Sequence, residues 1–288
     1  MDTMRDIRVR ARSVKQTLQV TTAMKLISTS KLRKARRRLD ETRPYFEAIR
    51  DTLHDIVERM DGADIPWFDE RPNKRERVQA TLVITSDRGL AGGYNHAIVR
   101  FTEEHCPPGS ILLPIGVTGK RYFMEKDYVL LEDFPVSAKE PSVSEAADIA
   151  AFAAELFLSG RVDEFRVIYT KMHSSVRQEP DMIELLPLAR TNLAPGRYRA
   201  AAPAYVYLPG ESQLFDFLAP RYLKGVIYGA LVEAFASEQT ARMTAMDAAS
   251  KNAKAMLEKL QLLYNRARQA AITNEVSEIV AGASALGD

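Results

Sequence analysis

The stretch MDAASKNAKAMLEKLQLLYNRARQA, residues 246–270, decides the fold that we expect for this chain. It lies within Ala230–Ala281, a run without glycine or proline that would form a helix of roughly 75 Å. Its apolar residues alternate in steps of three and four, the heptad pattern of a helix that winds around a partner helix. Such a helix is too long for one domain core, so it requires a long partner. The heptad positions are Met246, Ala249, Ala253, Met256, Leu260, Leu263, Ala267 and Ala270.

The N-terminal end of the chain can supply that partner. Residues 1–43 also lack glycine and proline, and their apolar stripe continues after Pro44 as far as Met60. Because proline removes one backbone hydrogen bond, we expect Pro44 to kink the helix without ending it. The sequence therefore predicts an antiparallel coiled coil between residues 1–60 and 211–288. The N-terminal stripe consists of Ile7, Ala11, Val14, Leu18, Leu32, Ala35 and Leu39.

The middle of the chain has a different texture. Residues 61–77 are rich in proline and charge and are typical of a linker. In residues 78–210, β-branched apolar runs alternate with amphipathic helical patterns, which favours an inserted Rossmann-like α/β domain with a largely parallel sheet. The predicted strands are 78–85, 111–117, 165–171 and 182–188, and the predicted helices are 95–105, 119–127 and 145–158.

Composition excludes several classes of protein. The 288 residues are 46% hydrophobic with a net charge of +2, which is ordinary for a globular chain and too mild to imply a polyanionic partner. Cys106 is the single cysteine, which excludes a disulfide within the chain and fits a reducing compartment. No apolar run reaches the roughly 18 to 20 residues that span a bilayer. The N-terminus lacks an apolar signal core, so we expect any membrane association to be peripheral.

Positive charge is concentrated near the N-terminus. Residues 1–43 contain thirteen Lys and Arg against four acidic residues, and the densest cluster is 31–38. This favours a surface for an acidic partner, although charged runs are often simply solvated helix faces. Nucleic acid is the weaker choice, because no aromatic stacking residue accompanies the charge. A basic coiled-coil protein that binds nucleic acid or acts as a scaffold remains the alternative function.

The glycine-rich loop SDRGLAGGYN, residues 86–95, invites a nucleotide-binding interpretation that its spacing does not support. A dinucleotide fingerprint requires G-x-G-x-x-G, and GVTGKR at 116–121 has too short a loop for a P-loop. The four histidines are scattered, and one cysteine cannot form a cysteine-type zinc site. We therefore expect no catalytic residue, no cofactor and no metal site, and we interpret the loop as a tight strand-to-helix turn.

Three separated blocks carry a family resemblance. They are TTAMK with SKL (21–25 and 30–32), the 86–95 loop, and ASEQ (236–239) to Met246 together with YNRARQAAITNEVSEIVAGA (264–283). In order and spacing they resemble the gamma subunits of F-type rotary ATP synthases, over the whole chain. The resemblance implies a non-catalytic central rotor shaft that couples ion-driven rotation to ATP synthesis or hydrolysis on a ring of alpha and beta subunits. It also implies contacts with the epsilon subunit and the membrane rotor c-ring, at the cytoplasmic face of a bacterial cell membrane.

The same resemblance implies which side chains contact the alpha/beta ring. One group on the N-terminal helix faces an acidic loop of beta, and a polar group near the C-terminus catches a beta subunit. Two further residues hold shaft positions of the motif, and an apolar group forms a bearing at the top of the ring. In that order the residues are Met24, Lys25, Lys31 and Arg33; Arg268, Gln269 and Thr273; Glu238 and Arg242; and Ile272, Val276, Ile279 and Val280.

Overall fold

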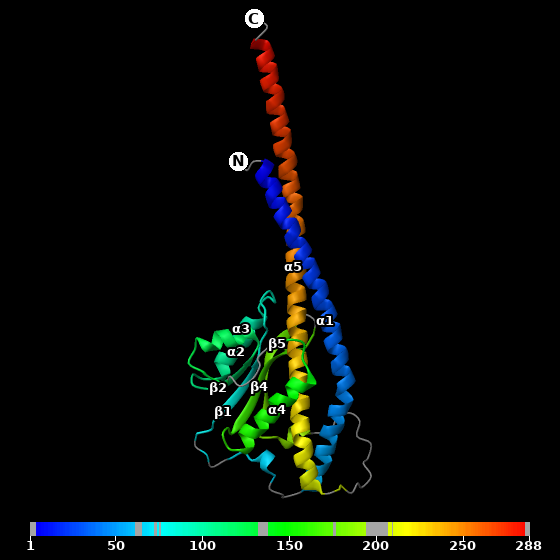
Figure 1. The fold of residues 1–288 in the computed structure, drawn as a ribbon, viewed down its shortest axis with the longest axis vertical. Helices are drawn as coiled ribbons and strands as arrows, with labels where there is room; N and C mark the ends of the chain where they lie inside the picture. The colour runs from blue at the N-terminus through cyan, green and yellow to red at the C-terminus, as the bar shows by residue number, and fades with distance from the viewer. Residues whose placement is uncertain are drawn as a thin grey trace. The chain divides into compact units, whose positions relative to one another are not determined.

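The computed structural model describes residues 4–60, 65–71, 74, 76–131, 138–174, 177–193, 207–208 and 210–285. It has a mixed α/β sheet with one long helix at each end of the chain, as the sequence predicts (Figure 1). In chain order the elements are α1 (Met4–Arg59), the 3-10 turn η1 (Pro66–Phe68), β1 (Gln79–Ile84), α2 (Tyr94–His105), β2 (Ile111–Ile115), α3 (Val117–Met124), β3 (Val129–Leu130), α4 (Val143–Leu158), β4 (Glu164–Met172), β5 (Gln178–Leu186), the turn η2 (Arg190–Leu193) and α5 (Glu211–Ala285).

These elements form two compact units. Met1–Thr29 with Arg242–Asp288 form one, which we call the paired-helix unit, and Ser30–Ala241 form the other, the sheet unit. Helices α1 and α5 contribute residues to both units.

The sheet unit contains five strands in the order β3-β2-β1-β4-β5. The first four strands are parallel, and β5 pairs antiparallel with β4 at the edge. The central strand β1 is buried over Ala80–Ile84, as expected when helices cover both faces of a parallel sheet. The two-residue strand β3 was not predicted, because Val129 and Leu130 are too short a run to show a pattern.

Two apolar clusters cover the two faces of this sheet. Leu82 and Ile84 belong to a cluster with side chains of α4, α5 and the C-terminal part of α1, whereas Val83 packs with α2 and α3 on the other face. Figure 1 shows α2 and α3 on one side of the sheet and α4 on the other. Full burial of a large apolar side chain stabilises the fold by roughly 1.5–3 kcal/mol, so the two faces are both substantial cores.

Local sequence explains where some helices begin and why others continue. Helix α4 begins at Val143, two residues before the predicted start, because Ser142 and Glu145 form a reciprocal capping box. Pro44 lies inside α1 and does not end it, as predicted, and Pro220 likewise lies inside α5.

In the paired-helix unit, α1 and α5 pack side by side and antiparallel (Figure 1). The Arg8 guanidinium donates to the Tyr264 hydroxyl at 2.7 Å, whereas Thr29, much further along α1, contacts Met243, much earlier in α5. The order of contacts along α5 is therefore the reverse of that along α1.

The seam of α5 differs in part from the predicted one. Met246, Ala253 and Leu260 are buried as expected, but Met256 and Leu263 are 43% and 47% exposed. The seam positions between the buried residues are instead Ser250, Leu257 and Tyr264, each one residue after the predicted Ala249, Met256 and Leu263. Two of these three positions, Leu257 and Tyr264, are also apolar or aromatic, so periodicity could not distinguish the two stripes. Ser250 and Tyr264 have polar partners on α1, namely Thr21 and Arg8, and these contacts select the observed stripe as the seam.

Candidate subunit-contact surface

The predicted contact residues at Met24 and Lys25 lie in the paired-helix unit. Met24 is half-buried. The Lys25 amine lies 2.6 Å from Asp247 Oδ1 on α5, so this lysine is engaged within the chain. Hydrogen bonds from Lys25 and Lys251 lower the pKa of Asp247 to about 2, and the carboxylate is therefore charged at neutral pH. Asp247 is not among the residues predicted from the sequence, although a negative charge next to the heptad position Met246 was a usable signal.

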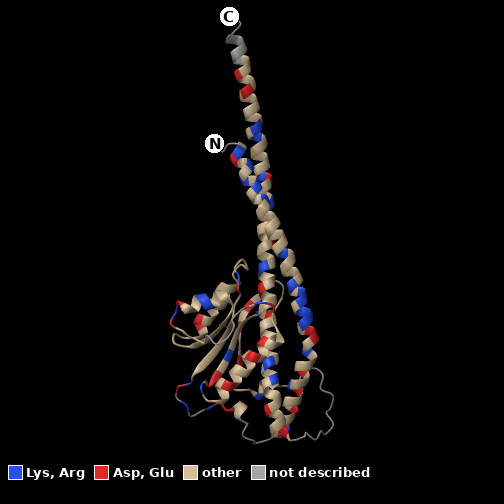
Figure 2. Ribbon diagram, in the orientation of Figure 1, with Lys and Arg blue, Asp and Glu red and all other residues tan. Residues whose placement is uncertain are grey.

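The basic cluster at 31–38 belongs to the sheet unit, and Figure 2 shows its Lys and Arg along α1. Lys31 is half-buried and Arg33 is exposed. Lys34 and Arg38 contact Glu140 at 2.9 and 3.4 Å. The hydrogen bond from Lys34 is the main reason that the pKa of Glu140 is lowered. Part of this charge therefore serves contacts inside the unit, and the exposed remainder is available to an acidic partner.

Glu238 and Arg242 are nearly covered by the chain itself. Their exposed fractions are 6% and 7%, which leaves little side-chain surface for another subunit. Their contact role stays a prediction.

The C-terminal part of α5 presents the remaining predicted residues to the outside. Arg268, Gln269 and Thr273 are exposed. An apolar stripe follows on the same helix, with exposed fractions of 52%, 53%, 70% and 59% for Ile272, Val276, Ile279 and Val280. Their spacing of i, i+4, i+7 and i+8 places these four residues on one helix face. Arg8, near the start of α1, contacts Tyr264. Because the helices are antiparallel, the stripe that begins at Ile272 lies beyond the described part of α1. Exposed apolar stripes of this kind mark interaction surfaces.

The glycine-rich loop forms the tight strand-to-helix turn that the sequence predicts. Its start is held by Asn95, whose side-chain oxygen accepts from the Ser86 backbone N–H at 3.0 Å. Asp87 accepts from the backbone N–H groups of Val117 and Ala138 at 3.1 and 2.9 Å. The N-terminus of α3 therefore donates to a carboxylate of this chain, and a helix N-terminus is a place where phosphate can otherwise bind.

Thr85 completes the same turn. Its hydroxyl oxygen accepts from the Gly119 backbone N–H at 3.0 Å. A Cβ on Gly116, whose φ is 94°, would lie 2.5 Å from that oxygen. Gly116 and Gly119 thus permit close packing of the start of α3 against Thr85 just after β1, and that packing is a structural reason for their presence.

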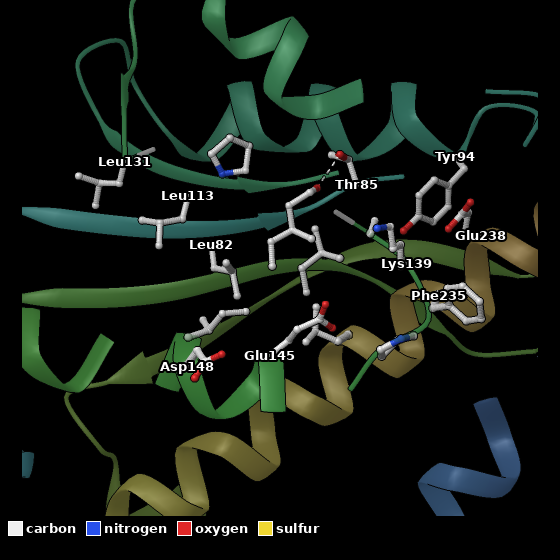
Figure 3. Close-up of a pocket in the computed structure, with 17 residues that line it drawn as sticks. Leu82, Thr85, Tyr94, Leu113, Leu131, Lys139, Glu145, Asp148, Phe235 and Glu238 are labelled. Carbon is white, nitrogen blue, oxygen red and sulfur yellow. Dashed lines mark hydrogen bonds between the residues drawn. The ribbon is translucent and has the colours of Figure 1, made fainter. Parts of the chain in front are cut away.

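A cavity of about 60 Å³ lies between the sheet and the helices α4 and α5 (Figure 3). Its walls are mostly apolar, including Leu82 and Leu113, and its charged groups are Lys139, Glu145, Asp148 and Glu238. This volume has room for only a few water molecules. Three carboxylates against one amine also oppose a phosphate group, so the cavity does not suit a nucleotide.

The described part of the chain contains neither a metal cluster nor a membrane-crossing helix. Within it, no three or more His, Cys, Asp or Glu side chains are grouped so that they could hold a metal ion. No helix in the described ranges is both long enough and apolar enough to cross a membrane.

Comparisons with known proteins place these observations in a family. A family model described as ATP synthase matches residues 3–286. The chain is 44% identical to an ATP synthase gamma chain of Ruminiclostridium cellulolyticum over 292 residues, covering 98% of each chain. It is 36% identical to the sodium-ion-specific gamma chain of Acetobacterium woodii over 302 residues, covering 99% of each.

Solved structures agree with this at the level of the fold. A chain of the Tetrahymena thermophila mitochondrial ATP synthase central stalk and c-ring is similar with a TM-score of 0.54 and 25% identity, over 80% of this chain and 99% of that one. A chain of the Euglena gracilis mitochondrial OSCP/F1/c-ring structure gives a TM-score of 0.65 at 19% identity, over 98% and 94%. Because the family model matches nearly the whole chain and gamma-chain relatives match it from end to end, the chain belongs to the ATP synthase gamma-chain family.

Proposed function

We propose that this chain is the central rotor-stalk subunit of a rotary ATP synthase and has no catalytic site of its own. It couples ion-driven rotation to ATP synthesis or hydrolysis on the alpha/beta ring. The observation that carries this proposal is the exposed C-terminal part of α5, where polar residues and then an apolar stripe extend past the described part of α1. A surface of this kind suits contact with other subunits.

The antiparallel pairing of α1 and α5 supports a coiled-coil shaft, and the sheet unit supports a Rossmann-like domain attached to it. A rotating shaft must favour different conformations in otherwise identical subunits. Shifting a two-state equilibrium from 1:99 to 99:1 requires about 5.5 kcal/mol, whereas an exposed ion pair contributes roughly 0–1 kcal/mol. The contact residues therefore act as a set.

The partners follow from the same proposal. The shaft contacts alpha and beta, and the sheet unit lies near epsilon and the membrane c-ring. The chain is then peripheral, at the cytoplasmic face of a bacterial cell membrane. Support comes from bacterial relatives named as gamma chains and from structural neighbours solved together with a c-ring.

The test is reconstitution with alpha and beta subunits and the membrane sector. We expect the double substitution Arg268→Ala and Gln269→Ala to lower the rate of coupled ATP synthesis, because both side chains are exposed contact candidates. Lys254→Ala with Glu258→Ala is the matched control on exposed positions of the same helix. Unchanged synthesis in the Arg268 and Gln269 variant would refute their contact role.

A separate measurement addresses catalysis. The purified chain is expected to show no ATP hydrolysis and no shift of its melting temperature with Mg-ATP, since the backbone N–H of Val117 at the start of α3 already donates to Asp87. Hydrolysis by the isolated chain, or its failure to assemble with alpha and beta, would overturn the proposed function.

A further inference from the structure

Polar side chains join α1 to α5 in the middle of the paired-helix unit. The hydroxyls of Thr21 and Ser250 lie 2.8 Å apart, and the Lys25 amine donates to Asp247 at 2.6 Å. Thr21 and Ser250 are only 7% and 8% exposed. We call Thr21, Lys25, Asp247 and Ser250 the polar band. Thr21 and Ser250 occupy buried positions where an apolar seam would normally continue, and Lys25 and Asp247 lie close to them, partly exposed.

On both sides of the polar band, residues of α1 and α5 are paired in the same register. The interval from Arg8 to Thr29 on α1 is three heptads, and the interval between their respective partners, Tyr264 and Met243 on α5, is also three heptads. Because the two intervals are equal, the helices stay in step through the band.

The charges favour this one alignment over its neighbours. A shift of one heptad in one direction would place Lys25 opposite Lys254, and a shift in the other would place Asp247 opposite Leu18. The first juxtaposes like charges, and the second leaves a carboxylate against an apolar side chain. Within α5, Asp247 is flanked by Lys251, which it contacts at 2.9 Å, so a displaced Lys25 would meet positive charge there too.

Stability alone does not explain the polar band. The side chains of Lys25 and Asp247 are 41% and 33% exposed, and ion pairs this exposed contribute little to the free energy of folding. Apolar residues at the buried positions of Thr21 and Ser250 would pack at least as well. A single polar position in a helix pair is, however, an effective device for specifying alignment.

We propose that Thr21, Lys25, Asp247 and Ser250 are positioning residues that fix how α1 lies on α5 and thereby where Met24 is presented relative to Arg268 and Gln269. Lys25 then acts inside the chain, and its ion pair with Asp247 replaces the direct contact with an acidic partner that the sequence predicts. The last step, the effect on coupling, rests on the proposed function. A displacement of one heptad would move the two contact sets apart or together by about 10 Å.

Charge exchange separates a positioning role from a direct contact. Lys25→Asp places two carboxylates together, and Lys25→Asp with Asp247→Lys restores an attractive pair. If Lys25 positions the helix, the double variant recovers what the single variant loses. If Lys25 binds an acidic partner, the double variant stays impaired, because residue 25 is still negative. Lys251→Ala is the matched control, since it removes an ion pair with the same aspartate inside α5.

The alignment is read out in the full chain by electron–electron double resonance. Spin labels are attached at Gln19→Cys and Glu275→Cys, both exposed positions, with Cys106→Ala to remove the native thiol. Along the helix axis the labels are separated by roughly 33 Å. We expect one narrow distance in the parent chain and in Lys251→Ala. In Lys25→Asp we expect a broadened distribution that extends toward distances shorter by up to about 10 Å, because Asp at position 25 can pair with Lys254.

Coupling is measured in the reconstituted complex as ions pumped per ATP hydrolysed. We expect Lys25→Asp to lower this ratio by at least about twofold, the lower end of typical coupling between neighbouring residues, and the double variant to recover it. Thr21→Val with Ser250→Ala should broaden the distance distribution while the melting temperature stays the same or rises. Helical content by circular dichroism verifies folding, and Lys25→Gln replaces Lys25→Asp if the latter does not fold.

Two results would overturn the inference. One is an unchanged distance distribution in the Lys25 variant, and the other is a double variant that recovers neither distance nor coupling. Failure of the parent complex to couple would instead count against the proposed function, and the distance measurement would still decide the positioning role.

Discussion

The ring of Phe46 on α1 packs directly against the backbone of Gly225 on α5. A Cβ added at position 225 would lie 2.5 Å from Phe46 Cδ1, closer than carbon atoms can approach. Both residues belong to the sheet unit, and Phe46 also lies against Tyr228, with ring centroids 6.2 Å apart. Glycine in the interior of a helix is intrinsically unfavourable, so its presence here reflects the close approach of the two helices.

This contact predicts opposite effects at two glycines of α5. Gly225→Ala should lower the free energy of unfolding by roughly 1–3 kcal/mol, because the new methyl group displaces Phe46. At Gly229 a Cβ would meet nothing within 4 Å, so Gly229→Ala should raise stability by about 0.5–1 kcal/mol through helix propensity. Urea unfolding followed by circular dichroism measures both. Equal effects at the two positions would contradict the packing argument.

The buried carboxylate of Asp163 should contribute to the free energy of unfolding in a pH-dependent way. Its side chain is 1% exposed and contacts Arg71 and Lys74 at 2.7 Å each. Burial by itself would raise the pKa of Asp163, but hydrogen bonds from Lys74, Arg71 and the Val78 backbone outweigh it and lower the pKa from 3.8 to about 2. A pKa lowered in the folded state stabilises the fold above about pH 4, and this stabilisation is lost as the pH falls toward 2.

Asp163→Asn is therefore expected to cost roughly 2–4 kcal/mol at pH 7, because the two cations lose their partner. The difference in unfolding free energy between parent and variant should shrink as the pH is lowered from 5 to 3. Asp181→Asn is the matched control. Asp181 pairs with Lys171, and both side chains are about 40% exposed, so that pair should contribute only ~0–1 kcal/mol. A pH-independent difference for Asp163→Asn would refute the assignment.

Asp87 should stabilise the glycine-rich turn. Its carboxylate accepts from two backbone N–H groups, one in α3 and one at Ala138. Asp87→Ala leaves both donors without this acceptor, which should cost roughly 1–3 kcal/mol. The exposed Asp148 provides the comparison, since Asp148→Ala should change stability by less than about 0.5 kcal/mol. Thermal unfolding of both variants measures the difference, and similar melting temperatures would argue against a structural role for Asp87.

The apolar stripe at the end of α5 should matter only in the complex. Ile279→Ser with Val280→Ser should change the free energy of unfolding of the isolated chain by less than about 0.5 kcal/mol, because both side chains are largely exposed. In the reconstituted synthase the same variant should lower the rate of ATP synthesis. Glu258→Ser, also exposed on α5, is the control. A variant that is fully active in the complex would remove the stripe from the contact surface.

Much of the site was visible in sequence because it depends on exposure along a helix. The spacing of Ile272, Val276, Ile279 and Val280 already places them on one face, and the structure finds that face exposed. Lys25 illustrates the limit, since its positive charge indicated an acidic partner but could not show that the nearest carboxylate is Asp247, which lies in the other terminal helix.

Periodicity, glycine and proline placement, and alternating strand and helix patterns determined by themselves that two long terminal helices flank an α/β sheet. These signals are local, because they depend on which side chains recur at intervals of two to four residues. Which of two neighbouring stripes of α5 becomes the seam, and which polar groups meet across it, was decided only by the tertiary structure. Both stripes of α5 contain apolar residues, so the choice depends on partners such as Thr21 for Ser250 and Arg8 for Tyr264, which only the folded chain brings together.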